Sequence, residues 1–220
     1  MLNPTTLAFL RDLKANNNKP WFDENRPVYE TAKGNFVNLL TYLINSLNQV
    51  DPGIAGAQLE PKKCLFRINR DVRFSANKAP YKDHFGAWFN KGGKAMNTAG
   101  YYLHLEPGNT FVAGGLYMPD APLLATIRQE IDYNLAQFEA ILNVPAFQKT
   151  YGELSREDAL QRPPKGYAAD NPAIEYLKLK SFTASHKISD KQLIASNLSK
   201  QILDSFTVLQ PLIAFLNTSL

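Results

Sequence analysis

The sequence changes from helical to strand-like periodicity at residues 62–82, KKCLFRINRDVRFSANKAPYK. Successive side chains of an extended strand point to opposite faces. The segment separates into an apolar set (Cys64, Phe66, Ile68, Val72 and Phe74) and a polar set (Lys63, Arg67, Asn69, Asp71, Arg73 and Ser75). Arg70 falls in register with the apolar set, which indicates a bulge or strand end. The pattern predicts a strand with one face in the core, ended by a turn at residues 76–80.

Helical patterns precede this segment. Asn3 and Pro4 are typical of a helix start, and we expect that helix to stop at residues 16–18. A second short helix is expected from residue 19. Apolar residues then recur at steps of three and four over residues 27–49, the period of a long amphipathic helix.

Strand patterns follow at residues 85–90, 101–106 and 110–118. Their short connections predict antiparallel neighbours, that is, a β-meander that includes residues 62–75. The pair Gly114 and Gly115 in the last strand indicates a bulge or the close approach of another group.

The remaining sequence returns to helical periodicity. A helix is expected over residues 120–142, a short helix from residue 172, an additional strand at 180–187, and a final helix launched by a capping box at Ser189. The fold class is therefore α+β, with N-terminal helices, a central antiparallel β-meander and C-terminal helices packed on the sheet. We expect residues 1–220 to form a single domain.

Composition favours a cytoplasmic protein. Hydrophobic residues make up 45% of the 220-residue chain and charged residues 20%, as in ordinary globular domains. The single cysteine, Cys64, forms no internal disulfide, which suits a reducing compartment. No apolar run reaches the roughly 18–20 residues of a membrane span, and the N-terminus does not resemble a signal peptide.

Basic residues are concentrated around the predicted first strand. Residues 61–94 contain nine lysines and arginines but only Asp71 and Asp83 as acids, whereas the whole chain has a net charge of +4. A local excess of positive charge attracts an anionic partner.

Three segments give the chain a resemblance to a known family. They are NNNKPWFDENRPVYE (16–30), RINRDVRFSANKAPYKDHFGAWF (67–89) and AGYYLHLEPGNTFVAGGLYMP (99–119). With these motifs the chain resembles the domain of unknown function 2461 family, uncharacterised bacterial and fungal proteins. The resemblance covers most of the chain, and it implies no activity, cofactor or catalytic residue.

The predicted ligand site therefore depends on residue chemistry alone. Guanidinium groups bind phosphate or carboxylate through paired hydrogen bonds. The candidate ligand-binding residues are Arg67, Asn69, Arg70, Asp71, Arg73, Ser75, Lys78, Tyr81 and Lys82. The same residues fit an internal ion-pair network or a solvated sheet edge. We expect Asp71 to act in part as a buried counter-charge for the arginines.

The leading interpretation is a basic pocket on the sheet that binds an anionic small molecule. One alternative is an enzyme acting on such a molecule, with Asp71, or His104 beside Glu106, moving a proton. Another is a module that docks its basic patch on an acidic protein or on nucleic acid, with aromatic side chains beside basic ones. Because the sequence has no Cys/His cluster and no helical histidine pair, we expect no metal site. The sequence identifies no cofactor and no oligomeric state.

Overall fold

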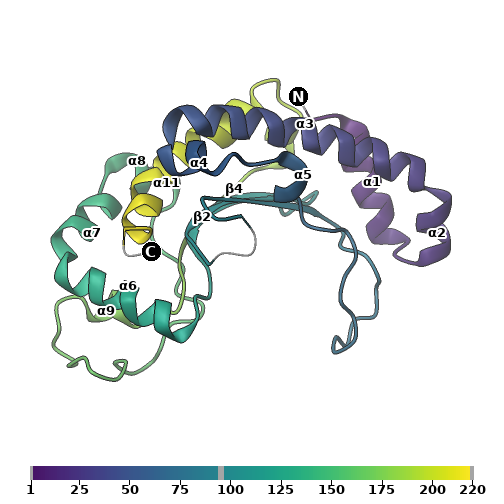
Figure 1. The fold of residues 1–220 in the computed structure, drawn as a ribbon. Coiled ribbons are helices and arrows are strands. Elements are labelled where there is room, and N and C mark those ends of the chain that lie inside the picture. The colour runs from purple at the N-terminus through teal and green to yellow at the C-terminus, as the bar shows by residue number, and fades with distance from the viewer. Residues whose placement is uncertain (1, 94–96, 219–220) are drawn as a thin grey trace.

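The computed structural model, which describes residues 2–93 and 97–218, is an arch with helices outside and a sheet beneath them (Figure 1). The helices are α1 (Pro4–Ala15), α2 (Lys19–Glu24), α3 (Arg26–Val50), α4 (Pro52–Ala57), α5 (Pro61–Cys64), α6 (Ala121–Tyr133), α7 (Leu135–Leu142), α8 (Pro145–Thr150), α9 (Ile174–Leu177), α10 (Asp190–Leu193) and α11 (Leu198–Leu216). The strands are β1 (Phe85–Asn90), β2 (Gly100–Leu105), β3 (Phe111–Leu116) and β4 (Phe182–Lys187). The predicted α+β class is confirmed.

Local sequence signals set the N-terminal helices. The Asn3 side chain accepts a hydrogen bond from the Thr5 main chain and caps α1, while Asn18 caps α2 by accepting from Trp21. These contacts satisfy main-chain donors that a helix leaves unpaired. The buried residues of α3 recur at steps of three and four from Tyr29 to Leu47, as expected.

Residues 62–82 do not form the predicted strand. Lys62 and Lys63 lie in α5, and the following residues make only isolated bridges, between Leu65 and Ala87 and between Asn69 and Tyr81. We call residues 66–83 the arm. The arm turns back on itself, because the Arg70 amide donates to Pro80 O and the Lys82 amide donates to Ile68 O.

The alternating pattern was misleading because the apolar set does not share one buried face. Cys64 and Ile68 are buried, but Phe66 is 37% exposed and Phe74, at the far end of the arm, is 97% exposed. Pro80 has no amide proton to extend the pairing. The prediction that these residues form a core-facing strand was therefore wrong, whereas the turn after Ser75 agrees with the reversal of the arm.

The four strands form one antiparallel sheet in the order β1-β2-β3-β4. The three strands predicted after residue 84 are confirmed, and the expected additional strand at 180–187 is β4, paired with β3. The connection between β3 and β4 contains α6 to α9, which form one limb of the arch (Figure 1).

One face of the sheet packs against α3 and α11. Phe85, Phe89 and Leu103 are buried on this side. Gly114 lies under α11, where an added Cβ would come within 2.7 Å of Leu209. Gly115 has φ +122° and lies against the Phe182 carbonyl. The expected close approach at this glycine pair is thus made by α11 and β4.

Two of the expected C-terminal helices differ from the structure. The helix expected over residues 120–142 is divided at Asn134, whose backbone leaves the helical region at φ −118° and ψ 35°. The capping box at Ser189 is present, but it begins only α10, and the long α11 starts at Leu198. Among the described helices, none is both long and apolar enough to cross a membrane.

Candidate functional site

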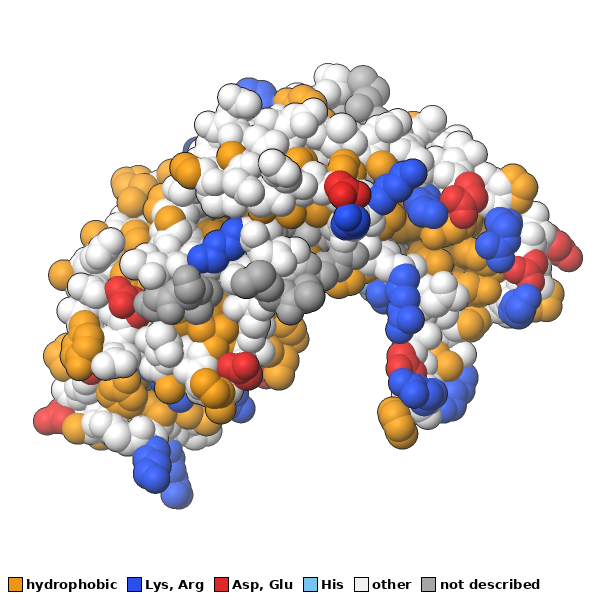
Figure 2. Space-filling model, viewed as in Figure 1, with side chains coloured by type: hydrophobic (Ala, Val, Ile, Leu, Met, Phe, Trp, Pro, Cys, Tyr) orange, Lys and Arg blue, Asp and Glu red, His pale blue; other side chains and the backbone are white. Residues whose placement is uncertain are grey.

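The face of the sheet that points away from α3 and α11 lines a groove of about 970 Å³. Figure 2 shows the molecule hollowed at this place, between the two limbs of the arch. Two rows of residues cross the sheet here because their strands are directly paired. The rows are Trp88–Tyr102–Ala113–Ser185 and Gly86–His104–Phe111–Lys187.

Aromatic side chains make up much of the groove lining. Trp88, Tyr102 and Phe111 come from the sheet, Phe66 comes from the arm, and Tyr117 follows β3. Gly86 leaves room for one of these rings, since a Cβ there would lie 2.8 Å from the Tyr102 hydroxyl. Such a surface offers flat apolar faces on which a planar ligand can stack.

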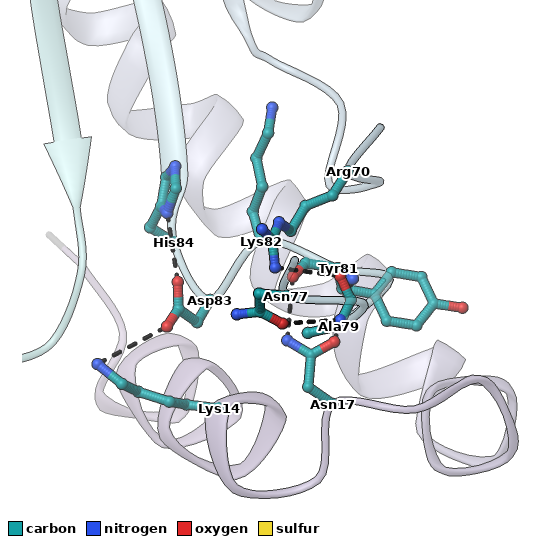
Figure 3. Close-up of a pocket in the computed structure, with 9 residues that line it drawn as sticks. All are labelled: Lys14, Asn17, Arg70, Asn77, Ala79, Tyr81, Lys82, Asp83 and His84. Carbon is teal, nitrogen blue, oxygen red and sulfur yellow. Dashed lines mark hydrogen bonds and ion pairs between the residues drawn. The ribbon is translucent and has the colours of Figure 1, made fainter. Parts of the chain in front are cut away.

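A second cavity, the basic pocket, lies between α1, the arm and the start of β1. It has a volume of about 500 Å³, and its lining residues are Lys14, Asn17, Arg70, Asn77, Ala79, Tyr81, Lys82, Asp83 and His84 (Figure 3). Three of these carry positive charge and one is a carboxylate. Lys82 and His84 line both the basic pocket and the groove, so the two cavities adjoin.

The arm is held to the turn between α1 and α2 by one asparagine. Asn17 Nδ2 donates to Tyr81 O at 3.0 Å, and the Tyr81 amide donates to Asn17 Oδ1 at 3.1 Å. The Tyr81 ring stacks on Phe22 with centroids 4.0 Å apart. These contacts fix the position of the arm beside the basic pocket.

Several cations of the arm bind its own oxygen atoms. Arg70 donates to Ala79 O at 3.2 Å and to Ser75 Oγ at 3.4 Å, and Lys78 donates to Val72 O at 3.0 Å. Lys82 Nζ donates to Arg67 O at 2.9 Å. Carbonyl and hydroxyl oxygens accept these hydrogen bonds without neutralising the positive charge.

The structure divides the nine predicted ligand-binding residues. Arg70, Tyr81 and Lys82 line the basic pocket. Asp71 and Arg73 form an ion pair at 2.7 Å, but both side chains are exposed, so Asp71 is not the expected buried counter-charge. The remaining four residues lie in the arm but do not line the basic pocket, and these are Arg67, Asn69, Ser75 and Lys78. Their part in binding stays a prediction.

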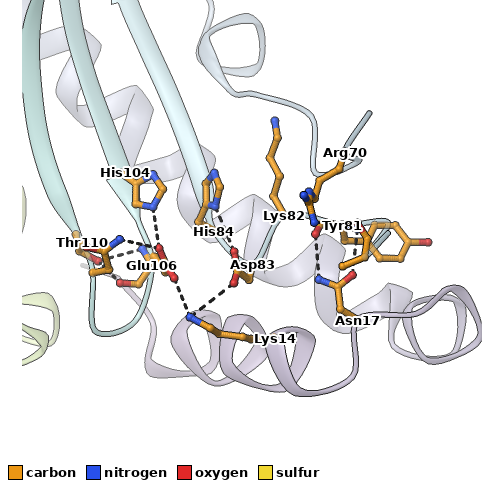
Figure 4. Close-up of polar contacts among 12 residues, drawn as sticks. Lys14, Asn17, Arg70, Tyr81, Lys82, Asp83, His84, His104, Glu106 and Thr110 are labelled. Carbon is orange, nitrogen blue, oxygen red and sulfur yellow. Dashed lines mark hydrogen bonds and ion pairs between the residues drawn. The ribbon is translucent and has the colours of Figure 1, made fainter. Parts of the chain in front are cut away.

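A nearly buried group of polar side chains lies beside the basic pocket, at the arm end of β1 and β2 (Figure 4). His104 Nε2 lies 3.1 Å from Glu106 Oε2, and Tyr102 Oη lies 3.1 Å from His104 Nδ1. Lys14 Nζ donates to Glu106 Oε1 at 2.9 Å. The His104 and Glu106 side chains are only 11% and 12% exposed. Helix α1, which carries Lys14, is therefore tied to the sheet.

His84, the residue just before β1, joins this group. Its ring lies 4.2 Å from the His104 ring, and its Nδ1 lies 3.4 Å from Asp83 Oδ1. One ligand atom each from His84, His104 and Glu106 lies within 4.8 Å of the others. We call these three residues the histidine cluster.

Burial and charge set the protonation of the cluster. Burial raises the pKa of Glu106, but hydrogen bonds from Lys14, His104 and Asn109 outweigh it and hold that pKa at about 2. Burial, helped by repulsion from His104, lowers the pKa of His84. At neutral pH Glu106 is therefore a carboxylate and His84 is a neutral imidazole.

Sequence reasoning missed His84, Lys14 and Asn17 as members of the site. The alternation His104-x-Glu106 within a strand was a signal, but only the pairing of β1 with β2 brings His84 to it. Arg67 and Arg73, two of the predicted ligand-binding residues, are not among the residues that line the groove or the basic pocket.

A family model described as conserved hypothetical protein, DUF2461, matches residues 5–215 of the 220-residue chain. No curated protein and no solved structure matches the chain.

Proposed function

The chain belongs to the DUF2461 family, and we propose that it binds a small anionic ligand, carrying phosphate or carboxylate, where the basic pocket meets the groove. The observation that carries this proposal is that Lys82 and His84 line both cavities. A ligand placed there reaches cationic groups at one end and aromatic faces at the other.

Arg70 and Lys82 are the cations that we assign to the anionic group, because both line the basic pocket. Lys14 also lines the basic pocket, but it is paired with Glu106 and lies 3.7 Å from Asp83. Arg70 donates to Ala79 O and Ser75 Oγ, and Lys82 donates to Arg67 O. An anion beside these two side chains would accept charge-assisted hydrogen bonds from them.

The rest of the ligand would lie on the groove lining. Trp88 and Tyr102 are paired across β1 and β2, so their side chains are neighbours on the same face of the sheet. Stacking on such rings favours a planar group. The combination describes an aromatic or heterocyclic molecule that carries a phosphate or carboxylate.

Thermal-shift and calorimetric titrations test the proposal directly. The probes are adenosine monophosphate, phthalate, adenosine and inorganic phosphate, each measured at low and moderate salt. The molecules that combine a ring with an anionic group should stabilise the protein most, and salt should weaken their binding. If no probe shifts the midpoint even at low salt, the proposal fails.

A second candidate is single-stranded nucleic acid held along the groove. The exposed Phe74 ring at the far end of the arm, with the Arg73 guanidinium 5.8 Å from its centroid, favours it. Aromatic and basic side chains together bind single strands without sequence preference. A short oligonucleotide that binds much more tightly than adenosine monophosphate would favour this candidate.

We also propose that residues 1–220 act as one domain in the cytoplasm. The buried apolar residues from α1 to α11 form one cluster, which supports the first part. The second part is supported by the single cysteine, Cys64, which is buried and cannot form an internal disulfide, as is common in reducing compartments.

A further inference from the structure

We propose that His84, His104 and Glu106 form a binding site for a divalent transition-metal ion, with Zn²⁺ as the representative. Each residue offers one ligand atom, and these atoms lie within 4.8 Å of one another. Two imidazoles and a carboxylate are a donor set that zinc uses in proteins.

The separations suit a single ion after small side-chain movements. Zinc binds nitrogen and oxygen at about 2.0–2.2 Å, so two ligand atoms on one ion lie roughly 3.0–3.5 Å apart. His104 Nε2 and Glu106 Oε2 are already 3.1 Å apart. The His84 and His104 ring centroids are 4.2 Å apart and the rings are tilted by 32°, so His84 must turn its ring toward the ion to close the remaining gap.

Metal-bound histidines usually make a hydrogen bond through their second ring nitrogen, and His104 has a partner for one. When Nε2 binds the ion, the remaining proton of the neutral ring resides on Nδ1. That N–H can donate to the Tyr102 hydroxyl, which lies 3.1 Å away. Such outer hydrogen bonds fix the tautomer and orientation of the ligating ring.

Glu106 can bind an ion without losing its other partner. Lys14 contacts Oε1, whereas Oε2 faces His104 and also accepts from Asn109 Nδ2, which leaves it a lone pair for the ion once His104 Nε2 binds the metal. Asp83 adds a second carboxylate beside His84. The carboxylates of Glu106 and Asp83 offset the charges of Lys14 and Lys82, so the ligand atoms themselves, and not a net negative charge, favour the cation.

An ion held by three protein groups has a coordination position left for water or a ligand. His84 lines both the groove and the basic pocket, so that position adjoins them. This last step, an exchangeable position beside the bound anion, rests on the proposed function. Metal binding itself does not, since it needs neither Arg70 nor Lys82.

The test uses the untagged chain, stripped with a chelator and dialysed. Zn²⁺ is titrated in competition with a chromogenic chelator, and Co²⁺ is titrated while its visible absorption is recorded. We expect one ion per chain and the intense Co²⁺ bands of a four- or five-coordinate site. His104→Gln and Glu106→Gln should each weaken binding by more than about 100-fold, and Tyr102→Phe by about 10–100-fold.

His186→Gln is the matched control, because His186 is the remaining histidine and its Nδ1 lies near Thr150 O, away from the cluster. It should leave metal binding unchanged. Thermal melts of the metal-free variants show whether each is folded. The proposal is overturned if the folded wild type takes up neither ion. It is also overturned if His104→Gln and Glu106→Gln bind both ions as the wild type does, which would leave the cluster as a purely structural hydrogen-bond network.

Discussion

Both main-chain polar groups of Tyr81 are hydrogen-bonded to the single side-chain amide of Asn17, 64 residues earlier in the chain. The contact ties the returning half of the arm to the turn that follows α1. Asn17 and Tyr81 both line the basic pocket, so the shape of the pocket depends on this pair (Figure 3).

Asn17→Ala should destabilise the protein and impair the basic pocket. It removes two hydrogen bonds and leaves the amide and carbonyl of Tyr81 without this partner, at a cost of about 1–3 kcal/mol in the free energy of unfolding. Urea melts measure the loss. Asn16→Ala is the control, because the Asn16 side chain donates to Asp12 O at the end of α1 and does not line the basic pocket. Equal losses in the two variants would contradict the role given to Asn17.

Glu106 should make stability depend on pH in the acid range. Its pKa is about 2 in the folded protein and near 4.5 when unfolded, so folding favours the carboxylate form. The resulting stabilisation is complete above about pH 5 and is lost as the pH falls from there through about 2. Melts of wild type and Glu106→Gln, recorded with a chelator present, should therefore converge as the pH is lowered through this window.

Glu175→Gln provides the comparison for this pH dependence. Glu175 is an exposed carboxylate whose pKa is also lowered, by Lys178 first and by Arg156. Solvent screens exposed ion pairs, so this variant should differ less from wild type across the same range. A larger effect at Glu175 than at Glu106 would argue against the buried network as the source.

Asp71→Asn should change stability little. Its ion pair with Arg73 is exposed at the tip of the arm, where water screens the interaction. Asp51→Ala is the contrast, because Asp51 is buried, accepts from the Tyr101 hydroxyl at 2.6 Å and caps α4. It should cost about 3 kcal/mol. A large loss in Asp71→Asn, measured in urea, would restore the buried-pair interpretation.

Arg70→Gln and Lys82→Gln should each weaken binding of the best anionic probe by at least about tenfold. Each removes one charge-assisted hydrogen bond and leaves the groove aromatics in place. Lys200→Gln is the control, since Lys200 pairs with Asp204 on α11, which packs on the opposite face of the sheet. Calorimetry at low salt measures all three, and an equal loss in the control would point to nonspecific attraction.

Local sequence signals predicted most of the elements. The caps at Asn3 and Ser189, the stripe of α3 and the strands after residue 84 depend on contacts between residues close in the chain or on simple periodicity. These interactions are short-ranged, so the residues that make them can be read directly from the sequence.

Only the tertiary structure decided the conformation of residues 62–82 and which residues come together in the site. An alternating pattern places side chains on two faces, but a strand forms only where a partner strand pairs with it and a core buries one of those faces. Phe74 is 97% exposed and is buried in no core. His84 and Glu106 meet only because β1 pairs with β2 in one register, with Gly86 opposite His104. Because side chains alternate along a strand, a shift of one residue in this register would place His104 on the other face of the sheet. The register depends on how two separate segments pair, so neither segment predicts it alone.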